Sequence, residues 1–155
     1  MESSETNTQE IQRINNTTLS YVAGMLDGEG SIIVNWSGKY PAAKIVMGAA
    51  CYGLLEWLKE LFGGSIVKRK PNELSRRPYY EWRCGDTIRM LKLLKPFIRM
   101  KRPQLEVAIA MMSLPYGSTE KKANLARQLE QLNQDRVHYS WQQETKVRIS
   151  DSEGG

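Results

Sequence analysis

Residues 21–30, YVAGMLDGEG, combine small residues with two acids in a pattern that could carry chemistry. The pattern predicts a helix in which Gly24 and Gly28, one turn apart, share a face without side chains. Glycine costs roughly 1 kcal/mol relative to alanine inside a helix, so two glycines on one face need a physical reason. Close approach of a second backbone is such a reason. The acids Asp27 and Glu29 stand at the end of this helix.

Two copies of this helix packed across a twofold axis would bring two Glu29 carboxylates side by side. Oxygen ligands suit Mg²⁺, which typically takes one or two carboxylates together with waters and phosphate oxygens. A divalent ion beside a phosphodiester can activate water and stabilise the leaving oxygen. The motif therefore suggests metal-assisted phosphodiester hydrolysis, provided that the chain also binds a phosphate polymer.

Positive charge is concentrated in the middle of the chain. The 155 residues carry a net charge of +5, but residues 64–102 alone hold twelve Lys and Arg against three acids, a net +9. Because neutralising phosphates releases counterions, a clustered basic surface supplies affinity for nucleic acids that does not depend on sequence. Taken alone, the charge is explained equally well by a solvated basic surface.

Hydropathy and turn signals predict the element order α-β-β-α-β-β-α-α-α. Helices are expected over residues 19–28, 53–62, 87–94, 104–114 and 120–136, with Thr17 or Thr18 capping the first. Strands are expected over residues 31–36, 44–48, 65–70 and 79–84. Two β-hairpins, each followed by a helix, can form one antiparallel sheet with helices on one face. The other face would present polar and basic side chains.

Residues 21–30 resemble the LAGLIDADG motif of homing endonucleases, with Val22 at its first Leu and Gly30 at its last Gly. The later segments GSIIVN, LLEWLKELFGGSIVKRK and YYEWRCGDTIRMLKLLKPFIRMKR are also similar to this family, so the resemblance covers about residues 18–114. It implies an α+β fold with an αββαββα core, a saddle-shaped antiparallel sheet with helices on one face, and further C-terminal helices.

The resemblance also implies an activity. Family members with a single motif act as homodimers, so this chain is expected to cleave a long, near-palindromic site in double-stranded DNA as a homodimer. The expected cofactor is Mg²⁺, with Mn²⁺ able to replace it. Because the family is encoded within introns and inteins, an intron-encoded endonuclease is expected.

Individual roles follow from the same resemblance. Glu29 stands at the family's metal-binding acid, with the main-chain carbonyl of Gly28 as a second metal ligand. Lys101 matches the basic residue that approaches the scissile phosphate, where it could polarise a water or offset developing charge. Glu29 and Lys101 are thus the expected catalytic residues, while Asp27 matches an acid that more often serves the helix end. The expected dimer interface comprises Tyr21, Ala23, Gly24, Asp27 and Gly28.

One stretch departs from the family. After the second strand the family commonly places Gln, Asn or Asp to order active-site water, whereas residues 47–51 read MGAAC. The thiol of Cys51 is the only polar side chain there. The departure predicts slow cleavage, or a reliance on other groups.

Alternation along the strands predicts the side chains that face DNA, although a slip of one residue would exchange the two faces. Asn pairs naturally with adenine, and Arg or Lys with guanine. The expected DNA-binding set is Ser31, Ile33, Asn35, Ser37, Lys44, Val46, Lys68, Lys70, Tyr79, Glu81 and Arg83. Asn35, Lys44, Lys68, Lys70 and Arg83 are its candidates for base or phosphate contacts.

Two other functions fit the same sequence. An RNA-binding intron maturase would use the same basic surface without requiring Glu29, and a DNA-binding regulator would bind without cutting. The departure at residues 47–51 slightly favours the maturase, whereas an intact Glu29 flanked by two glycines favours the nuclease.

Bulk properties bound these alternatives. The length suits one domain, expected over residues 17–136, between a flexible leader (1–16) and a tail (137–155) whose last residues are disordered. No apolar run approaches the roughly 18 residues of a membrane span. The N-terminus is not a secretory signal. Cys51 and Cys84 are expected as free thiols. Together these features predict an intracellular protein of an organelle matrix or a microbial cytoplasm.

Overall fold

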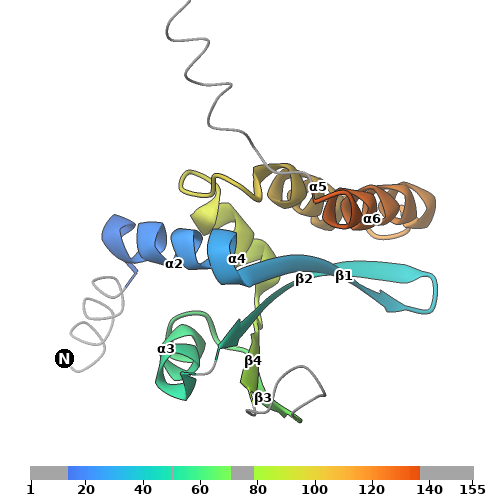
Figure 1. The fold of residues 1–155 in the computed structure, drawn as a ribbon. Helices are drawn as coiled ribbons and strands as arrows, with labels where there is room; N and C mark the ends of the chain where they lie inside the picture. The colour runs from blue at the N-terminus through green and yellow to red at the C-terminus, as the bar shows by residue number, and fades with distance from the viewer. Residues whose placement is uncertain (1–13, 50, 71–78, 137–155) are drawn as a thin grey trace, which may run out of the picture.

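The first described helix runs directly into the sheet, with no loop between them (Figure 1). The computed structural model describes residues 14–49, 51–70 and 79–136. Helix α2 (Asn16–Glu29) precedes strands β1 (Gly30–Ser37) and β2 (Tyr40–Ala49), helix α3 (Tyr52–Phe62), and strands β3 (Ser65–Arg69) and β4 (Tyr79–Arg83). Helices α4 (Thr87–Leu94), α5 (Arg102–Met112) and α6 (Thr119–Gln134) follow. The predicted order of elements is confirmed.

The four strands form one antiparallel sheet in the order β1-β2-β4-β3. Ile32 pairs with Ile45, and Met47 pairs with Trp82, so these four side chains lie on the same face and are buried. Alternate residues along each strand lie on the opposite face, which we call the open face. The period of two predicted from the sequence therefore separates a core face from an exposed one.

Every described helix contributes to a core on the other side of the sheet. Helices α5 and α6 lie along the β1–β2 hairpin, and α3 packs beside β3 and β4 (Figure 1). Trp82 is fully buried at the centre of this layer and donates a hydrogen bond from Nε1 to the carbonyl of Gly63 at 2.9 Å. Fully buried leucines from the helices complete the core: Leu26, Leu55, Leu91, Leu105 and Leu129. No helix within the described ranges is long and apolar enough to cross a bilayer.

Helix α6 braces β1 through both apolar and polar contacts. Ala126 and Leu129 are buried in the common core. Asn133 donates from Nδ2 to the carbonyl of Ile32 at 2.8 Å, and Trp36 donates from Nε1 to Glu130 Oε1 at 3.0 Å. Helix α6 thus holds the β1–β2 hairpin of its own chain.

Several predicted boundaries are wrong for identifiable reasons. The N-cap of α2 is Asn15, whose side chain accepts from the backbone N–H of Thr18, so Thr17 and Thr18 lie inside the helix. Strand β2 begins at Tyr40 rather than at residue 44, because it pairs along the whole of β1 despite Pro41. Residues 1–13 of the predicted leader, the predicted tail (137–155) and residues 71–78 lie outside the described residues.

The turn from α3 into β3 depends on two glycines. Gly63 and Gly64 have φ values of 68° and 96°, which other residues rarely adopt. A Cβ built on Gly64 would lie 2.0 Å from the carbonyl oxygen of Arg83. This close approach fixes the main chain at the end of β4 against the start of β3.

The two cysteines are predicted to differ sharply in reactivity. Cys84 is buried, and burial raises the pKa of its thiol to about 11, whereas Cys51 is exposed. Because the thiolate is the nucleophile, one thiol of the native protein should react rapidly with a disulfide reagent at mildly alkaline pH. Cys51→Ser should remove that fast phase, and denaturant should release the second thiol. Two fast thiols in the native protein would contradict the packing of β4.

Candidate functional site

Glu29 stands at the junction between α2 and β1. It is exposed, while Gly30, which opens β1, is buried and donates its N–H to the carbonyl of Leu26. A Cβ built on Gly30 would lie 2.4 Å from Cδ1 and 3.0 Å from Cα of Leu26, so a side chain there would clash with the last turn of the helix. Glycine at this position therefore lets the strand leave the helix without a loop and keeps Glu29 at the helix end.

The buried acid Asp27 ties α2 to the segment that enters α5. Its Oδ2 accepts from the backbone N–H of Arg99, and its Oδ1 accepts from the backbone N–H of Lys101, both at 2.9 Å. Both carboxylate oxygens thus serve the main chain just before α5. Asp27 was expected at the dimer interface, but its side chain instead points into its own chain, because those two amides need acceptors.

Lys101 lies at the same end of α2 as Glu29. Its Nζ donates to the carbonyl of Asp27 at 2.5 Å. Carbonyls in the last turn of a helix lack partners within the helix and form the negative end of its dipole, which attracts a cation. Burial lowers the pKa of the Lys101 ammonium, and the charges of Asp27 and Glu29 partly oppose that shift. The two expected catalytic residues, distant in sequence, are therefore brought within electrostatic range.

The oxygens at the end of α2 fit a magnesium ion better than a metal that needs a full protein cage. Glu29 offers an exposed carboxylate, and Gly28 is an exposed residue in the last turn, where carbonyls lack helical partners. Among the described residues, no group of three or more His, Cys, Asp or Glu could hold a metal. Mg²⁺ keeps several waters and needs only one or two protein carboxylates beside phosphate oxygens.

The exposed face of α2 is lined by Tyr21, Gly24 and Gly28; we call it the glycine stripe. Tyr21 is 57% exposed and its ring lies 5.8 Å from that of Trp57 on α3. A Cβ built on Gly24 or Gly28 would meet nothing within 4 Å. Ala23, expected on this face, is instead fully buried in the core of its own chain. Nothing within the described parts of the chain explains the two glycines by packing.

The open face carries the DNA-facing residues predicted on three of the four strands. Ser31 pairs with Val46, Ile33 with Lys44, and Val46 with Arg83, so these side chains share one face. By the same alternation the face also carries Asn35, Ser37, Tyr79 and Glu81. These residues are exposed or half-buried in the chain.

The side chains of strand β3 lie on the opposite faces of the sheet from those expected. Lys68 pairs with Tyr80, and Arg69 pairs with Tyr79, so Arg69 lies on the open face and Lys68 on the helix side. Lys70 follows the end of β3. Alternation could not resolve this strand, because Ile66 and Val67 are both apolar and suit either face. Arg69 is therefore absent from the predicted DNA-binding set. Its place could have been inferred from Glu81, because an acid on a basic face favours a cation on the neighbouring strand.

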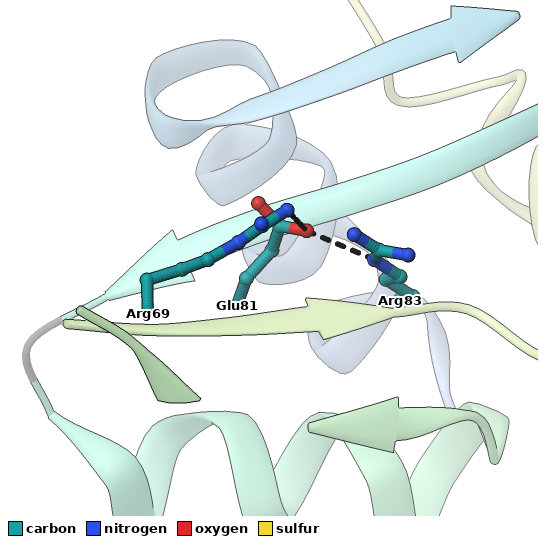
Figure 2. Close-up of polar contacts among 3 residues, drawn as sticks. All are labelled: Arg69, Glu81 and Arg83. Atoms are coloured by element: carbon teal, nitrogen blue, oxygen red, sulfur yellow. Dashed lines mark hydrogen bonds and ion pairs between the residues drawn. The ribbon is translucent and has the colours of Figure 1, made fainter. Parts of the chain in front are cut away.

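Arg69, Glu81 and Arg83 form a carboxylate-bridged arginine pair on the open face (Figure 2). Glu81 Oε1 accepts from Arg69 Nη2 and from Arg83 Nε, each at 2.9 Å. Partial burial raises the pKa of Glu81, but the hydrogen bonds and charges of the two arginines outweigh it, and the net pKa is lowered. The trio therefore presents one net positive charge to solvent.

A hollow lies beside Arg83 on the open face. Asn35, Lys44 and Arg83 supply its polar groups, and Ile33 and Val46 supply apolar surface. Its remaining lining comes from Gly64, Ser65, Cys84 and Gly85. Donors and acceptors arranged around an apolar floor suit the edge of a base pair, which offers both hydrogen-bonding groups and, at thymine, a methyl group.

Replacing Glu29 should shift the protonation of Lys101. Because the Glu29 charge raises the pKa of Lys101, Glu29→Gln should lower that pKa further below its usual range. An NMR titration of the Lys101 side chain would measure the change. Glu56→Gln, which removes an exposed carboxylate on α3, is the matched control and should leave the Lys101 titration unaltered. An unchanged pKa in Glu29→Gln would show that the two groups are not coupled.

Several solved structures are similar to this chain in fold. No protein-family model and no curated protein matches the sequence. The structure is similar to that of the homing endonuclease I-CvuI in complex with the I-CreI target, with a TM-score of 0.60 and 17% identity over 75% of this chain and 82% of that one. It is also similar to the archaeal intron-encoded homing endonuclease I-Vdi141I complexed with DNA, with a TM-score of 0.61 and 17% identity over 75% and 84% of the two chains.

A third similar structure is the LAGLIDADG meganuclease I-AabMI bound to uncleaved DNA, with a TM-score of 0.51 and 16% identity. The match covers 72% of this chain and 43% of that one. At these identities the similarity is one of fold, and it confirms the α+β architecture predicted from the sequence. The chain has the fold of the LAGLIDADG homing endonucleases.

Proposed function

We propose that the chain is a homodimeric, site-specific endonuclease that cleaves a long pseudo-palindromic site in double-stranded DNA with Mg²⁺, or with Mn²⁺ in its place. The observation that carries this proposal is the glycine stripe of α2, which ends at Glu29 and Lys101. In a dimer that packs along the glycine stripe, the Glu29 and Lys101 of each copy would lie at the interface. Each copy would thus provide one Glu29–Lys101 pair for one strand of a duplex.

The energetic cost of the stripe supports self-association. Each glycine costs roughly 1 kcal/mol relative to alanine within a helix, and no packing in the described chain compensates for it. Close packing of two helices at the stripe would compensate, because backbones without side chains can approach closely. An isologous contact of this kind is twofold symmetric, so each copy would read one half of a near-palindrome.

The open face supports DNA as the partner. It combines Lys44, Arg69 and Arg83 with uncharged polar groups such as Asn35, and a two-stranded ribbon fits the major groove. I-CvuI and I-Vdi141I, which share this fold, were solved with DNA. We extend double-stranded DNA binding to this chain on these two grounds.

The residues at the end of α2 divide the chemistry between them. Glu29 and the Gly28 carbonyl would hold the magnesium ion, which when bound supplies Lewis-acid stabilisation of charge on phosphate oxygens. Asp27 fixes the main chain of Lys101, and its carbonyl holds the ammonium at the helix end. A cation fixed in a half-buried position can offset charge that develops on the scissile phosphate.

Residues 47–51 favour a second candidate. Met47 is buried on the helix side of the sheet, and in the described part of this stretch only the exposed Cys51 carries a polar side chain. No amide or carboxylate orders water there, which suits a non-cleaving DNA-binding protein or an intron maturase. A salt-dependent gel shift that compares the gene's own intron RNA with its DNA target would separate the maturase from the DNA-binding forms.

The nuclease proposal predicts that Glu29→Gln abolishes cleavage while DNA binding persists. The substrate is a supercoiled plasmid that carries the rejoined flanks of the gene's insertion site, incubated with Mg²⁺. The wild type should linearise it, whereas Glu29→Gln, which lacks the metal-binding charge, should leave it uncut. Glu56→Gln should cut normally. Equal rates for wild type and Glu29→Gln would remove Glu29 from the mechanism, and binding without cutting under Mg²⁺ and Mn²⁺ would favour the non-cleaving candidate.

The dimer proposal predicts that Gly24→Leu yields a folded monomer. A side chain at Gly24 meets open space within the chain, so circular dichroism and the melting temperature should change little. It would, however, separate two helices packed at the stripe. Analytical ultracentrifugation of wild type, Gly24→Leu and the control Lys92→Leu, which adds the same side chain to an exposed site on α4, would decide. A monomeric wild type, or a dimeric Gly24→Leu, would reject the stripe as the interface.

A further inference from the structure

In the carboxylate-bridged arginine pair the acid is much less exposed than the two arginines. The side chain of Glu81 is 17% exposed, whereas those of Arg69 and Arg83 are 42% and 47% exposed. Figure 2 shows the carboxylate between the two guanidinium groups. The acid is therefore largely covered by its partners, and the surface offered to a ligand is cationic.

The terminal edge of the Arg83 guanidinium, which carries both amino groups, is available to a ligand. Its Nε donates to Glu81, while its two terminal amino groups have no hydrogen-bond partner among the described residues. Two parallel N–H groups at the end of an arginine match N7 and O6 of guanine in the major groove. The bond at Nε fixes the plane of the guanidinium without using those groups.

The backbone beneath Arg83 is also fixed. Arg83 pairs with Val46 on β2 and with Ser65 on β3. The carbonyl of Arg83 lies against Gly64, where no side chain fits. Small residues at Gly64, Ser65 and Gly85 line the hollow beside it. The backbone of Arg83 and the plane of its guanidinium are therefore both fixed. The hollow beside the side chain leaves space for the edge of a base pair.

Arg69 is less suited to read a base. Its Nη2 donates to Glu81, and its Nε is buried with no hydrogen-bond partner among the described residues. One of its two terminal nitrogens is therefore already engaged with Glu81, whereas both terminal nitrogens of Arg83 are uncommitted within the described chain. Arg69 remains a cation that can approach a phosphate.

We propose that Arg83 reads a guanine in each half-site and that Glu81 is a positioning residue that orients Arg83 rather than a base-reading acceptor. This inference rests on the proposed DNA binding and homodimer, and adds to them one base identity and the residue that sets it. The competing possibility is that Glu81 accepts directly from N4 of a cytosine, a pairing that carboxylates also make. The two possibilities predict effects at different base positions.

The experiment selects bound duplexes from a pool randomised over about two helical turns, roughly 20 base pairs, with the full-length wild type, Arg83→Ala and Glu81→Ala. Wild type should enrich a guanine in each half-site. Arg83→Ala and Glu81→Ala should both lose that guanine, by about ten-fold or more in relative affinity, and should keep the other enriched positions. Lys92→Ala, which removes a cation from an exposed site on α4, is the charge-matched control and should keep all of them.

A second measurement separates positioning from simple structural support. Removing N7 with 7-deazaguanine at the selected position should weaken wild-type binding and leave Arg83→Ala binding unchanged. Glu81→Ala removes a negative charge from a surface that faces phosphates, so it should bind random-sequence duplex at least as tightly as wild type while discriminating less. Glu81→Gln, which retains an oxygen acceptor for Nε, should restore part of the discrimination.

Three outcomes would overturn the proposal. Glu81→Ala and Arg83→Ala could relax different base positions, which would make Glu81 a reader in its own right. Wild type could select a site whose guanines are insensitive to Arg83→Ala, which rejects Arg83 as the reader while leaving DNA binding intact. Wild type could enrich no duplex at all, which rejects the DNA-binding function together with this inference.

Discussion

The site depends on one buried carboxylate. Asp27 accepts from the main chain at Arg99 and Lys101, and its own carbonyl accepts from the Lys101 ammonium. These bonds join the last turn of α2 to the segment that immediately precedes α5, which lies far away in sequence. Leaving a buried acid without hydrogen-bond partners is costly, so these bonds hold the end of α2 against the segment that leads into α5. The position of Lys101 beside Glu29 follows from this link.

The sheet adds a second constraint, since one face must be buried and the other left open. Ile45, Met47 and Trp82 bury the core face, and this fixes the register of β2 against β4. A shift of one residue would bury Arg83 and expose Trp82. The same hydrophobic requirement that folds the chain therefore also aims Arg83 and Glu81 at solvent. The packing of the core and the composition of the open face are therefore not independent.

Much of this architecture is predictable from the sequence. Helical periodicity and β-branched runs locate every described element. The family resemblance indicates Glu29 within residues 21–30 and Lys101 within the later segment that ends in PFIRMKR. The errors arise where local signals conflict. Pro41 disfavours a strand, yet pairing with Trp36 across the β1–β2 hairpin extends β2 through it. Adjacent apolar residues hide the register of β3, and only its pairing with β4 assigns Arg69 to the open face. The partners of Asp27 lie too far along the chain for any local pattern to predict.

The direct passage from α2 into β1 has a mechanical consequence. A loop would absorb rotation between a helix and the strand that follows it, whereas Gly30, packed against Leu26, leaves no such slack. In a dimer joined through α2, a change in the crossing angle of the two α2 helices would rotate both sheets, because each helix is rigidly joined to its sheet. Residues of α2 that never touch DNA would then set how far apart the two sheets lie along a duplex. The length of the recognised sequence would be determined by helix packing as much as by the side chains that read it.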